Sequence, residues 1–261
     1  MNASFDVVIV GGGVTGAAVG YGLAKRGVKT CLVDAVPTFS RASRANMGLI
    51  WCQSKALGCP QFVRWGFASS RAYGNLAAEL KELSGIDTGY APTGGIIPCL
   101  GEAELEARAQ FIEKLRAETE DGTYPASVLS RKELEGMLPK VPFGPEVSGG
   151  IWSDMDGYVD PLHLMFAFRK SFVRLGGTLF AGERVSEVKP SGKGYAVVCG
   201  GRTLECGKAV LAAGLGVRKL AAQLGTDIPV FPNKSQVMLL ERIPADVLPI
   251  PLLGIARTFG G

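Results

Sequence analysis

Histidine and long hydrophobic runs are scarce in this sequence. His163 is the single histidine of the 261 residues, which excludes metal sites built from several histidines and argues against a Ser/His/Asp catalytic triad. No run is long enough to cross a membrane, and the apolar stretch Val7–Val10 is too short and lacks the preceding basic residues of a signal peptide. We therefore expect a soluble, cytoplasmic protein without a transmembrane segment.

Closely spaced cysteine motifs and runs of like charge are absent as well. The six cysteines follow an irregular spacing with no C-x-x-C, which is typical of free thiols in a reducing compartment. Lys and Arg number 28 against 24 for Asp and Glu, and no segment concentrates the excess, so nucleic acid is not an expected partner. With 47% hydrophobic residues, the chain can bury one large core or two interleaved ones.

Glycine, by contrast, is abundant, and four of the 36 glycines stand close together near the N-terminus. The segment Gly11–Gly16 follows an expected strand, Phe5–Val10, and opens an expected helix, Val14–Arg26. A second expected strand, Lys29–Asp34, completes a βαβ unit. In this context the G-x-G-x-x-G pattern predicts a dinucleotide site, because glycine otherwise only costs backbone entropy there.

The residues of this pattern have distinct expected roles. Gly11 makes the tight turn, Gly13 lets a pyrophosphate approach the helix N-terminus, and Gly16 lets helix and strand pack closely. Asp34 can accept hydrogen bonds from an adenosine ribose, and its charge disfavours the 2′-phosphate of NADP. The cofactor-binding residues predicted from this unit are Gly11, Gly12, Gly13, Val14, Thr15, Gly16 and Asp34.

The choice between NAD and FAD depends on the residues after this unit. A nicotinamide-binding domain normally supplies its third parallel strand soon after the second. Here Thr38–Gly48 is polar and loop-like, a helix comes next, and the next convincing parallel strand, at Val210–Ala213, comes much later. This order favours FAD, with an NAD-dependent dehydrogenase as the less favoured alternative.

Beyond the βαβ unit, helical segments give way to several short strands. The expected helices are Gln61–Ser84, Glu102–Glu118, a short one with a Ser130/Glu133 capping box, and one that begins at Asp160-Pro161 and runs to Leu175. Tyr90–Leu100 is expected to form a strand and turn, and further strands are expected at Thr178–Phe180, Arg184–Lys189, Tyr195–Cys199, Arg202–Cys206, Lys208–Ala213 and Gln236–Leu240.

These elements predict an α/β fold with two interleaved domains. A Rossmann-like FAD-binding domain with a parallel sheet would comprise residues 1–89 and 150–226. An α+β substrate domain with an antiparallel sheet would comprise residues 90–149 and 227–261 and would be incomplete at its C-terminus.

The sequence resembles the FAD-dependent amine oxidoreductases of the D-amino-acid oxidase, glycine oxidase and sarcosine oxidase group. The resemblance spans nearly the whole chain and rests on V-I-V-G-G-G-V-T-G, Asp34, S-R-A-S-R-A-N-M-G, D-G-Y-V-D-P and V-L-A-A-G. Within the group, R-A-N-M-G-L-I-W-C-Q-S-K is most similar to the β subunits of opine oxidases and to hydrogen cyanide synthase subunits. Members usually continue past the point that matches Gly261, so we expect either a fragment or a chain completed by a partner.

The resemblance implies further cofactor contacts. The segment matching Ser43–Gly48 lies along the pyrophosphate and the flavin ring in such enzymes, the backbone at Val185 holds adenine, and V-L-A-A-G forms a second glycine turn. The residues implied in this way are Ser43, Arg44, Ala45, Asn46, Gly48, Val185, Ala212, Ala213 and Gly214. The chain departs from the family at Lys234-Ser235, where Arg-Gly is usual.

The resemblance also implies the chemistry. FAD would oxidise a small-molecule amine that carries a carboxylate, such as an amino acid or an opine, to an imine. An arginine suits bidentate recognition of the carboxylate, and Arg257 is the candidate. The electrons would pass to oxygen or to a redox centre in a hetero-oligomeric partner subunit. The alternative is a subunit that holds FAD without catalysing the reaction.

Overall fold

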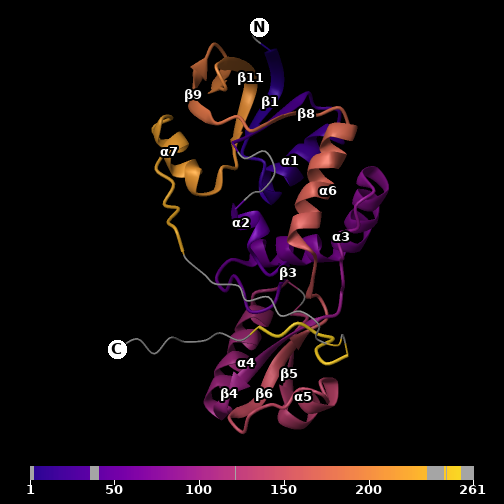
Figure 1. Cartoon of the computed structure of the whole chain (residues 1–261). Coiled ribbons are helices and arrows are strands. Elements are labelled where there is room, and N and C mark those ends of the chain that lie inside the picture. The colour runs from indigo at the N-terminus through magenta and orange to yellow at the C-terminus, as the bar shows by residue number, and fades with distance from the viewer. Residues whose placement is uncertain (1–2, 36–40, 121, 234–243, 245, 254–261) are drawn as a thin grey trace. The chain divides into compact units, whose positions relative to one another are not determined.

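The structure, a computed structural model, describes residues 3–35, 41–120, 122–233, 244 and 246–253 (Figure 1). Their contacts divide the chain into two compact units, each made of several stretches. Unit 1 comprises the described residues within 1–47, 77–88 and 160–237, and unit 2 comprises those within 48–76, 89–159 and 238–261. Unit 2 thus includes residues 48–76 and 150–159, which the sequence pattern assigns to the expected FAD-binding domain. Which unit binds cofactor and which binds substrate stays a prediction.

Unit 1 is built on a six-stranded sheet in the order β8-β2-β1-β11-β10-β9. β8, β2, β1 and β11 pair in parallel, while β10 runs antiparallel to both β11 and β9. The strands are β1 (Ala3–Val10), β2 (Thr30–Asp34), β8 (Thr178–Ala181), β9 (Val185–Ser191), β10 (Gly194–Cys199) and β11 (Arg202–Leu211). The helices are α1 (Val14–Ala24), α2 (Arg41–Arg44), α6 (Pro161–Arg174), the 3-10 helix η1 (Gly214–Gly216) and α7 (Val217–Ala222). The mainly parallel sheet confirms the expected α/β class.

The central strands of this sheet are buried on both faces, which explains their continuous apolar sequence. In β1, Val8 and Val10 belong to a core shared with residues of β9, β10 and α7. Val7 and Ile9 belong to a second core, which contains Phe172 of α6. The carboxyl ends of β1 and β2, where the glycine segment and Asp34 lie, are therefore fixed between two packed layers.

Two expectations for this sheet are wrong in detail. Arg202–Cys206 and Lys208–Ala213 are not separate strands, because β11 continues through Gly207 and lies between β10 and β1 along its length. The next parallel strand after β2 is β8 rather than Val210–Ala213. Helix α6 precedes β8 and supplies the crossover that a parallel pair requires, but unit 2 separates both from β2 in the sequence.

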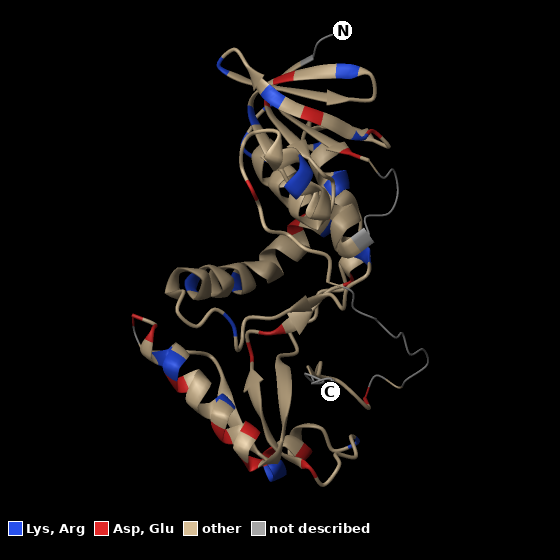
Figure 2. Cartoon of the chain, turned by 90° about the vertical axis from the view of Figure 1, so that its left-hand side faces the viewer, with Lys and Arg blue, Asp and Glu red and all other residues tan. Residues whose placement is uncertain are grey.

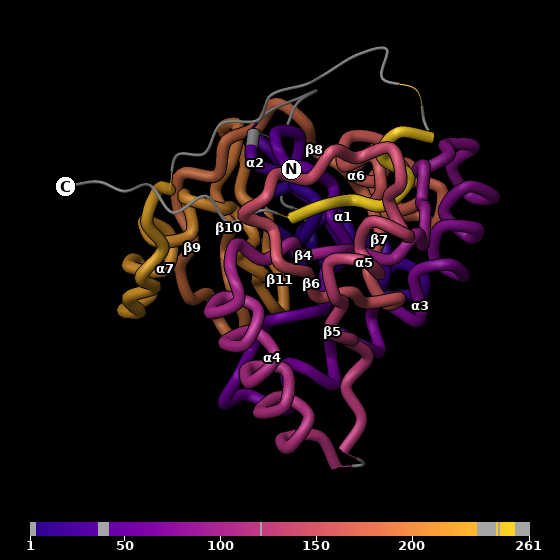
Figure 3. The backbone as a smooth tube through the Cα atoms, turned by 90° about the horizontal axis from the view of Figure 1, so that it is seen from below, coloured from indigo at the N-terminus to yellow at the C-terminus, as the bar shows by residue number. Residues whose placement is uncertain are grey.

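Unit 2 contains two antiparallel sheets, a three-stranded one in the order β4-β6-β5 and a pair formed by β3 and β7. Figure 3 shows α4 and α5 beside the larger sheet. The strands are β3 (Leu49–Ile50), β4 (Gly95–Leu100), β5 (Ser127–Ser130), β6 (Val147–Ser153) and β7 (Gly157–Tyr158). The helices are α3 (Pro60–Ser84), which ends in unit 1, α4 (Gly101–Ala117) and α5 (Arg131–Met137). The expected strand Gln236–Leu240 lies outside the described residues.

Helix α4 carries charges of both signs, as Figure 2 shows. Glu102 and Glu104 lie in its first turn, and Lys114 and Arg116 lie in its last, so the side-chain charges complement the helix dipole. On its buried side, Ile112 and Leu115 pack in a core with strands β4 and β6.

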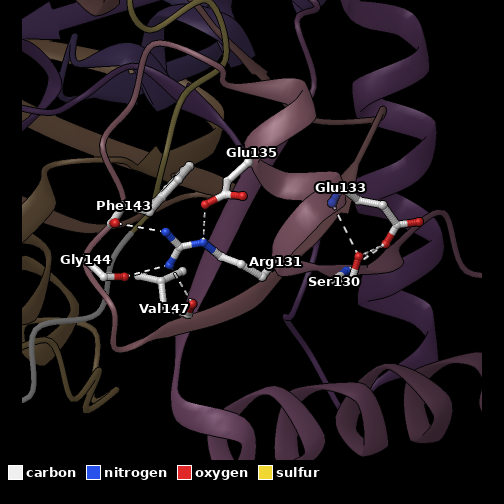
Figure 4. Close-up of polar contacts among 7 residues, drawn as sticks. All are labelled: Ser130, Arg131, Glu133, Glu135, Phe143, Gly144 and Val147. Carbon is white, nitrogen blue, oxygen red and sulfur yellow. Dashed lines mark hydrogen bonds and ion pairs between the residues drawn. The ribbon is translucent and has the colours of Figure 1, made fainter.

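The capping box expected at the start of α5 is confirmed. Ser130 Oγ accepts a hydrogen bond from the Glu133 N–H at 3.3 Å, and the Glu133 carboxylate accepts one from the Ser130 N–H at 2.8 Å (Figure 4). The adjacent Arg131 donates to the carbonyl oxygens of Phe143, Gly144 and Val147 and pairs with Glu135 (Figure 4). These bonds fasten the connection that leads into β6.

Candidate cofactor-binding site

The turn after β1 brings three segments of unit 1 into backbone contact. Gly11 has φ of +105°, which disfavours any residue with a side chain, and its N–H donates to the Val33 carbonyl oxygen at 2.8 Å. A Cβ at Gly11 would press on the carbonyl oxygen of Ala212, just after β11. A Cβ at Gly16 would press on the carbonyl oxygen of Gly11 itself. The glycine turn therefore lies in close backbone contact with both the start of α1 and the end of β11, which leaves no space for side chains at Gly11 and Gly16.

Helix α1 begins within the glycine segment. Gly13 is its N-cap residue and has no side chain with which to cap it. The first helical N–H, that of Val14, donates to Ser43 Oγ at 2.9 Å. Ser43 belongs to the segment that the resemblance places along the pyrophosphate, and the structure brings this one residue of the segment to the glycine turn. A helix N-terminus of this kind presents N–H groups and a partial positive charge to an anion.

Asp34 ends β2 directly opposite the glycine turn. It is buried, with 8% of its surface exposed, and a Cβ at Gly12 would lie 2.8 Å from its Oδ2. Arg169 of α6 places Nη1 3.4 Å from the same oxygen and is itself only 6% exposed. The sequence reasoning missed Arg169. The available signal was its place on the apolar face of α6, four residues after Met165 and three before Phe172.

The other residues implied by the resemblance lie around this turn to different extents. The Ala212 N–H donates to the Val10 carbonyl oxygen at 2.8 Å, and Ala213 and Gly214 follow at the start of η1. Val185 opens β9, and the Glu183 N–H just before it donates to the Asp34 carbonyl oxygen at 2.9 Å. The structure thus places the start of β9 near the end of β2.

The remaining implied residues follow α2. Arg44, Ala45 and Asn46 are exposed, and the Asn46 amide donates to the Ser43 carbonyl oxygen at 2.9 Å, which folds this segment on itself. Gly48, at φ of +68°, lies in unit 2, where its carbonyl oxygen accepts a bond from the Val159 N–H. The cofactor roles of these residues stay predictions.

Unit 2 contains a buried polar cluster that the sequence did not reveal. Asp156 is 1% exposed and accepts hydrogen bonds from the Cys52 N–H at 2.6 Å and from the Gln53 side chain at 2.7 Å. Burial raises the pKa of the Asp156 carboxyl above its ordinary value. The loop that follows Gln53 holds Ser54 and Ala56 at φ of 58° and 65°, and these conformations strain residues with side chains. Asp156 opens the D-G-Y-V-D-P motif, which was the available signal.

A cavity of about 250 Å³ lies beside this loop, within unit 2. Its walls come from the stretch 49–55 and the first turns of α3, with Trp51, Phe62 and Tyr73 among its aromatic residues and Lys55 as its cation. Arg257, the carboxylate ligand predicted from the sequence, lies outside the described residues. Among the residues described, no cluster of His, Cys, Asp and Glu is suited to a metal, and no helix is long and apolar enough to cross a membrane.

Known proteins with similar sequences include an opine oxidase subunit and a glycine oxidase. An opine oxidase subunit of Agrobacterium tumefaciens (strain Ach5) is 35% identical over 238 residues, which cover 91% of this chain and 63% of that protein. Glycine oxidase of Geobacillus kaustophilus (strain HTA426) is 28% identical over 253 residues, covering 97% and 64%. The crystal structure of glycine oxidase from Geobacillus kaustophilus matches with a TM-score of 0.78, over 86% of this chain and 59% of that one. The chain spans less than two thirds of the length of these relatives.

The residues at the glycine turn fit the adenosine diphosphate half of FAD. Gly11 and Gly16 leave bare backbone where the turn is tightest, the N-terminus of α1 faces the same turn, and Asp34 supplies the carboxylate at the end of β2. NAD would use the same features, but the sequence matches the family described as FAD dependent oxidoreductase over residues 6–260. The chain belongs to this family of FAD-dependent oxidoreductases.

Proposed function

We propose that the protein oxidises a small-molecule amine that carries a carboxylate, an amino acid or an opine, with FAD as the oxidant. The observation that carries the proposal is the junction of the glycine turn, the end of β11 and Asp34 in unit 1, because it has the features of a dinucleotide site and the chain belongs to this family. The names of the relatives, an opine oxidase subunit and glycine oxidase, support the substrate class.

Each part of the site has a task in this proposal. The N–H groups at the start of α1 bind the pyrophosphate, Asp34 accepts bonds from the adenosine ribose, and the backbone at Val185 orients adenine. Ser43 holds the end of α2 against the same turn. FAD held in this way would supply the two-electron oxidant: a hydride would leave the carbon next to the amine nitrogen, the nitrogen would lose a proton, and water would hydrolyse the resulting imine.

A carboxylate on the substrate needs a cation to orient it. Arg257 is the candidate from the sequence, and Lys55 is a cation that lines the described cavity of unit 2. Arg257→Met and Lys55→Met distinguish the two, because loss of the carboxylate ligand raises KM for the amino acid. The same loss leaves KM unchanged for the corresponding amine without a carboxylate.

The amine chemistry is tested by anaerobic titration of the FAD-loaded protein with glycine, sarcosine, proline and an opine, followed by the flavin absorbance. We expect one of these amines to bleach the flavin bands, while succinate, a carboxylate without an amine, leaves them unchanged. Bound flavin that no amine bleaches would contradict the proposed oxidation and support a second candidate function, that of a subunit which only holds the cofactor.

This second candidate is a subunit that holds FAD and acts only with a partner. It is favoured by the names of two relatives, since the opine oxidase chain of Agrobacterium tumefaciens and hydrogen cyanide synthase subunit HcnC of Pseudomonas aeruginosa are both called subunits. In that case the electrons leave through a redox centre of the partner. Affinity purification of the tagged protein from its own cells, followed by amine-dependent dye reduction, tests this candidate: activity that stays with a co-purified chain supports it.

A further inference from the structure

Arg169 is a charged residue in a position that the helix otherwise gives to apolar side chains. It lies on the buried face of α6 with Met165 and Phe172, and only 7% of its side chain is exposed. Burying a guanidinium requires a partner that replaces its water. The partner is Asp34, 135 residues away in the sequence, at 3.4 Å between Nη1 and Oδ2.

The geometry puts the Asp34 carboxylate between two fixed groups. Arg169 reaches Oδ2 from α6, and the backbone of Gly12 lies so close that a Cβ there would be 2.8 Å from the same oxygen. The Asp34 side chain is 11% exposed, so it has little freedom to turn. The contact with Arg169 is therefore one of the interactions that hold the Asp34 carboxylate beside the glycine turn.

We propose that Arg169 is a positioning residue for the adenosine ribose of FAD, acting through Asp34. An ionised carboxylate offers about four acceptor positions, so Asp34 can accept from the guanidinium and from ribose hydroxyls together. Arg169 also offsets the negative charge of Asp34, which stands beside the turn that receives the doubly charged pyrophosphate. The inference rests on FAD occupying the glycine turn.

A purely structural role for Arg169 makes a different prediction. A guanidinium that only fills the core would affect unfolding of the protein but would not change how much a ribose hydroxyl contributes to binding. The contribution of the hydroxyl is therefore the readout, and it is measured by comparing ADP-ribose with analogues that lack the 2′- or the 3′-hydroxyl on the adenosine ribose.

The experiment is calorimetric titration of these ligands into the apo form of the wild-type protein, Arg169→Gln, Arg169→Lys and a matched control, Lys170→Gln. Lys170 is the next residue of α6 and is exposed. In the wild type, removing the hydroxyl that Asp34 binds should weaken binding about tenfold or more, the value of one hydrogen bond to a charged group. In Arg169→Gln, ADP-ribose should bind about tenfold more weakly and the penalty for removing that hydroxyl should fall below about twofold. Lys170→Gln should match the wild type.

An Arg169→Gln protein that keeps the full hydroxyl penalty overturns the inference. If Arg169→Gln does not fold, Arg169→Lys is the variant that tests the inference, because it keeps the positive charge and loses the planar guanidinium group. A wild-type hydroxyl penalty in the lysine variant then overturns the inference, and a reduced penalty supports it. A wild-type protein that binds ADP-ribose but whose flavin no amine bleaches contradicts only the proposed oxidation. A wild-type protein that binds no ADP-ribose contradicts both.

Discussion

At the scale of single residues, the glycines of the turn are required for two different reasons. Gly16 is held in a helix where a Cβ would press on the Gly11 carbonyl oxygen, so the fold itself needs glycine there. Gly13, at φ of −64° and ψ of −179°, has an extended conformation that any residue adopts. The backbone conformation alone therefore does not require glycine there, and we expect the close approach of a pyrophosphate to require it.

This difference predicts that substitution at Gly13 mainly affects FAD retention and that substitution at Gly16 mainly affects the stability of the protein. Gly13→Val should lower the unfolding free energy of the apo protein by no more than about 1 kcal/mol, since valine is a poor N-cap residue, and should abolish FAD retention, since its side chain blocks the pyrophosphate. Gly16→Ala should destabilise the apo protein by about 1–3 kcal/mol through overpacking. Urea unfolding and the flavin content of the purified proteins measure the two effects.

Gly22 of α1 provides the matched control. A Cβ there would meet only the flexible end of Arg26 at 3.7 Å, so Gly22→Ala should stabilise α1 by about 0.5–1 kcal/mol. Full FAD content in Gly13→Val would show that the pyrophosphate does not approach this residue. A stable Gly16→Ala protein would show that the turn can relax.

At the scale of helices and strands, local chemistry made the boundaries of α5 and α6 predictable. Asp160 caps α6 by accepting bonds from the Leu162 and His163 N–H groups, both at 2.8 Å, and Pro161 follows at the first helical position. Such signals involve residues only a few positions apart. They act in the same way whatever the rest of the chain does, and therefore the sequence is enough to find them.

The features that the sequence did not reveal depend on distant partners. Gly149-Gly150 is typical of a turn, yet both residues lie inside β6, where Cβ atoms would press on carbonyl oxygens of Leu129 and Ile97 in the flanking strands. The sequence around Arg169 predicts only a helix, and its partner Asp34 comes from the distant strand β2. Neither neighbour can be deduced from local spacing, because strand order and helix placement decide it.

The capping box of α5 gives a prediction with a defined dependence on pH. Hydrogen bonds from the Ser130 side chain and backbone lower the pKa of Glu133 below its ordinary value of 4.5. A lowered folded-state pKa means that this carboxylate stabilises the fold above pH 4.5 and that the stabilisation is lost as the pH falls through the folded pKa. The stability advantage of wild type over Glu133→Gln should therefore shrink below that pH, as followed by urea unfolding.

Removal of the Ser130 side chain tests the contribution of the cap to the unfolding free energy at neutral pH. Ser130→Ala loses the acceptor for the Glu133 N–H and should lower the unfolding free energy by about 1 kcal/mol. Ser127→Ala, at an exposed position of the preceding strand, is the control and should change it by less than about 0.5 kcal/mol. A Glu133→Gln protein whose difference from wild type stays constant with pH would contradict the role of the charge.

At the scale of the whole molecule, all six cysteines are free, as the irregular spacing predicts, and they differ sharply in exposure. Burial raises the pKa of Cys31 to about 12 and those of Cys99 and Cys199 to about 11. Cys59, which precedes α3, is exposed. The thiolate is the reactive form, so the buried thiols of both units should be almost inert in the folded protein.

Thiol labelling of the native protein at about pH 8 tests this expectation. Cys59 should react first, and Cys31 should react on the order of 100-fold more slowly or slower still, because it is buried and burial raises its pKa. Cys59→Ser should remove the fast phase, while Cys99→Ser should leave it intact. Peptide mapping that finds Cys31 labelled as fast as Cys59 would mean that unit 1 opens readily.

The pairing of β1 with β11 has a consequence for synthesis on the ribosome. Val8 pairs with Ala209, so about 200 further residues must be synthesised after β1 before its neighbour β11 exists. At roughly 5–20 residues per second, the wait is on the order of 10 to 40 seconds. During that time β2 pairs with one edge of β1, and the edge that later pairs with β11 stays open to other chains. The nascent protein should therefore depend on chaperones until β11 has left the ribosome.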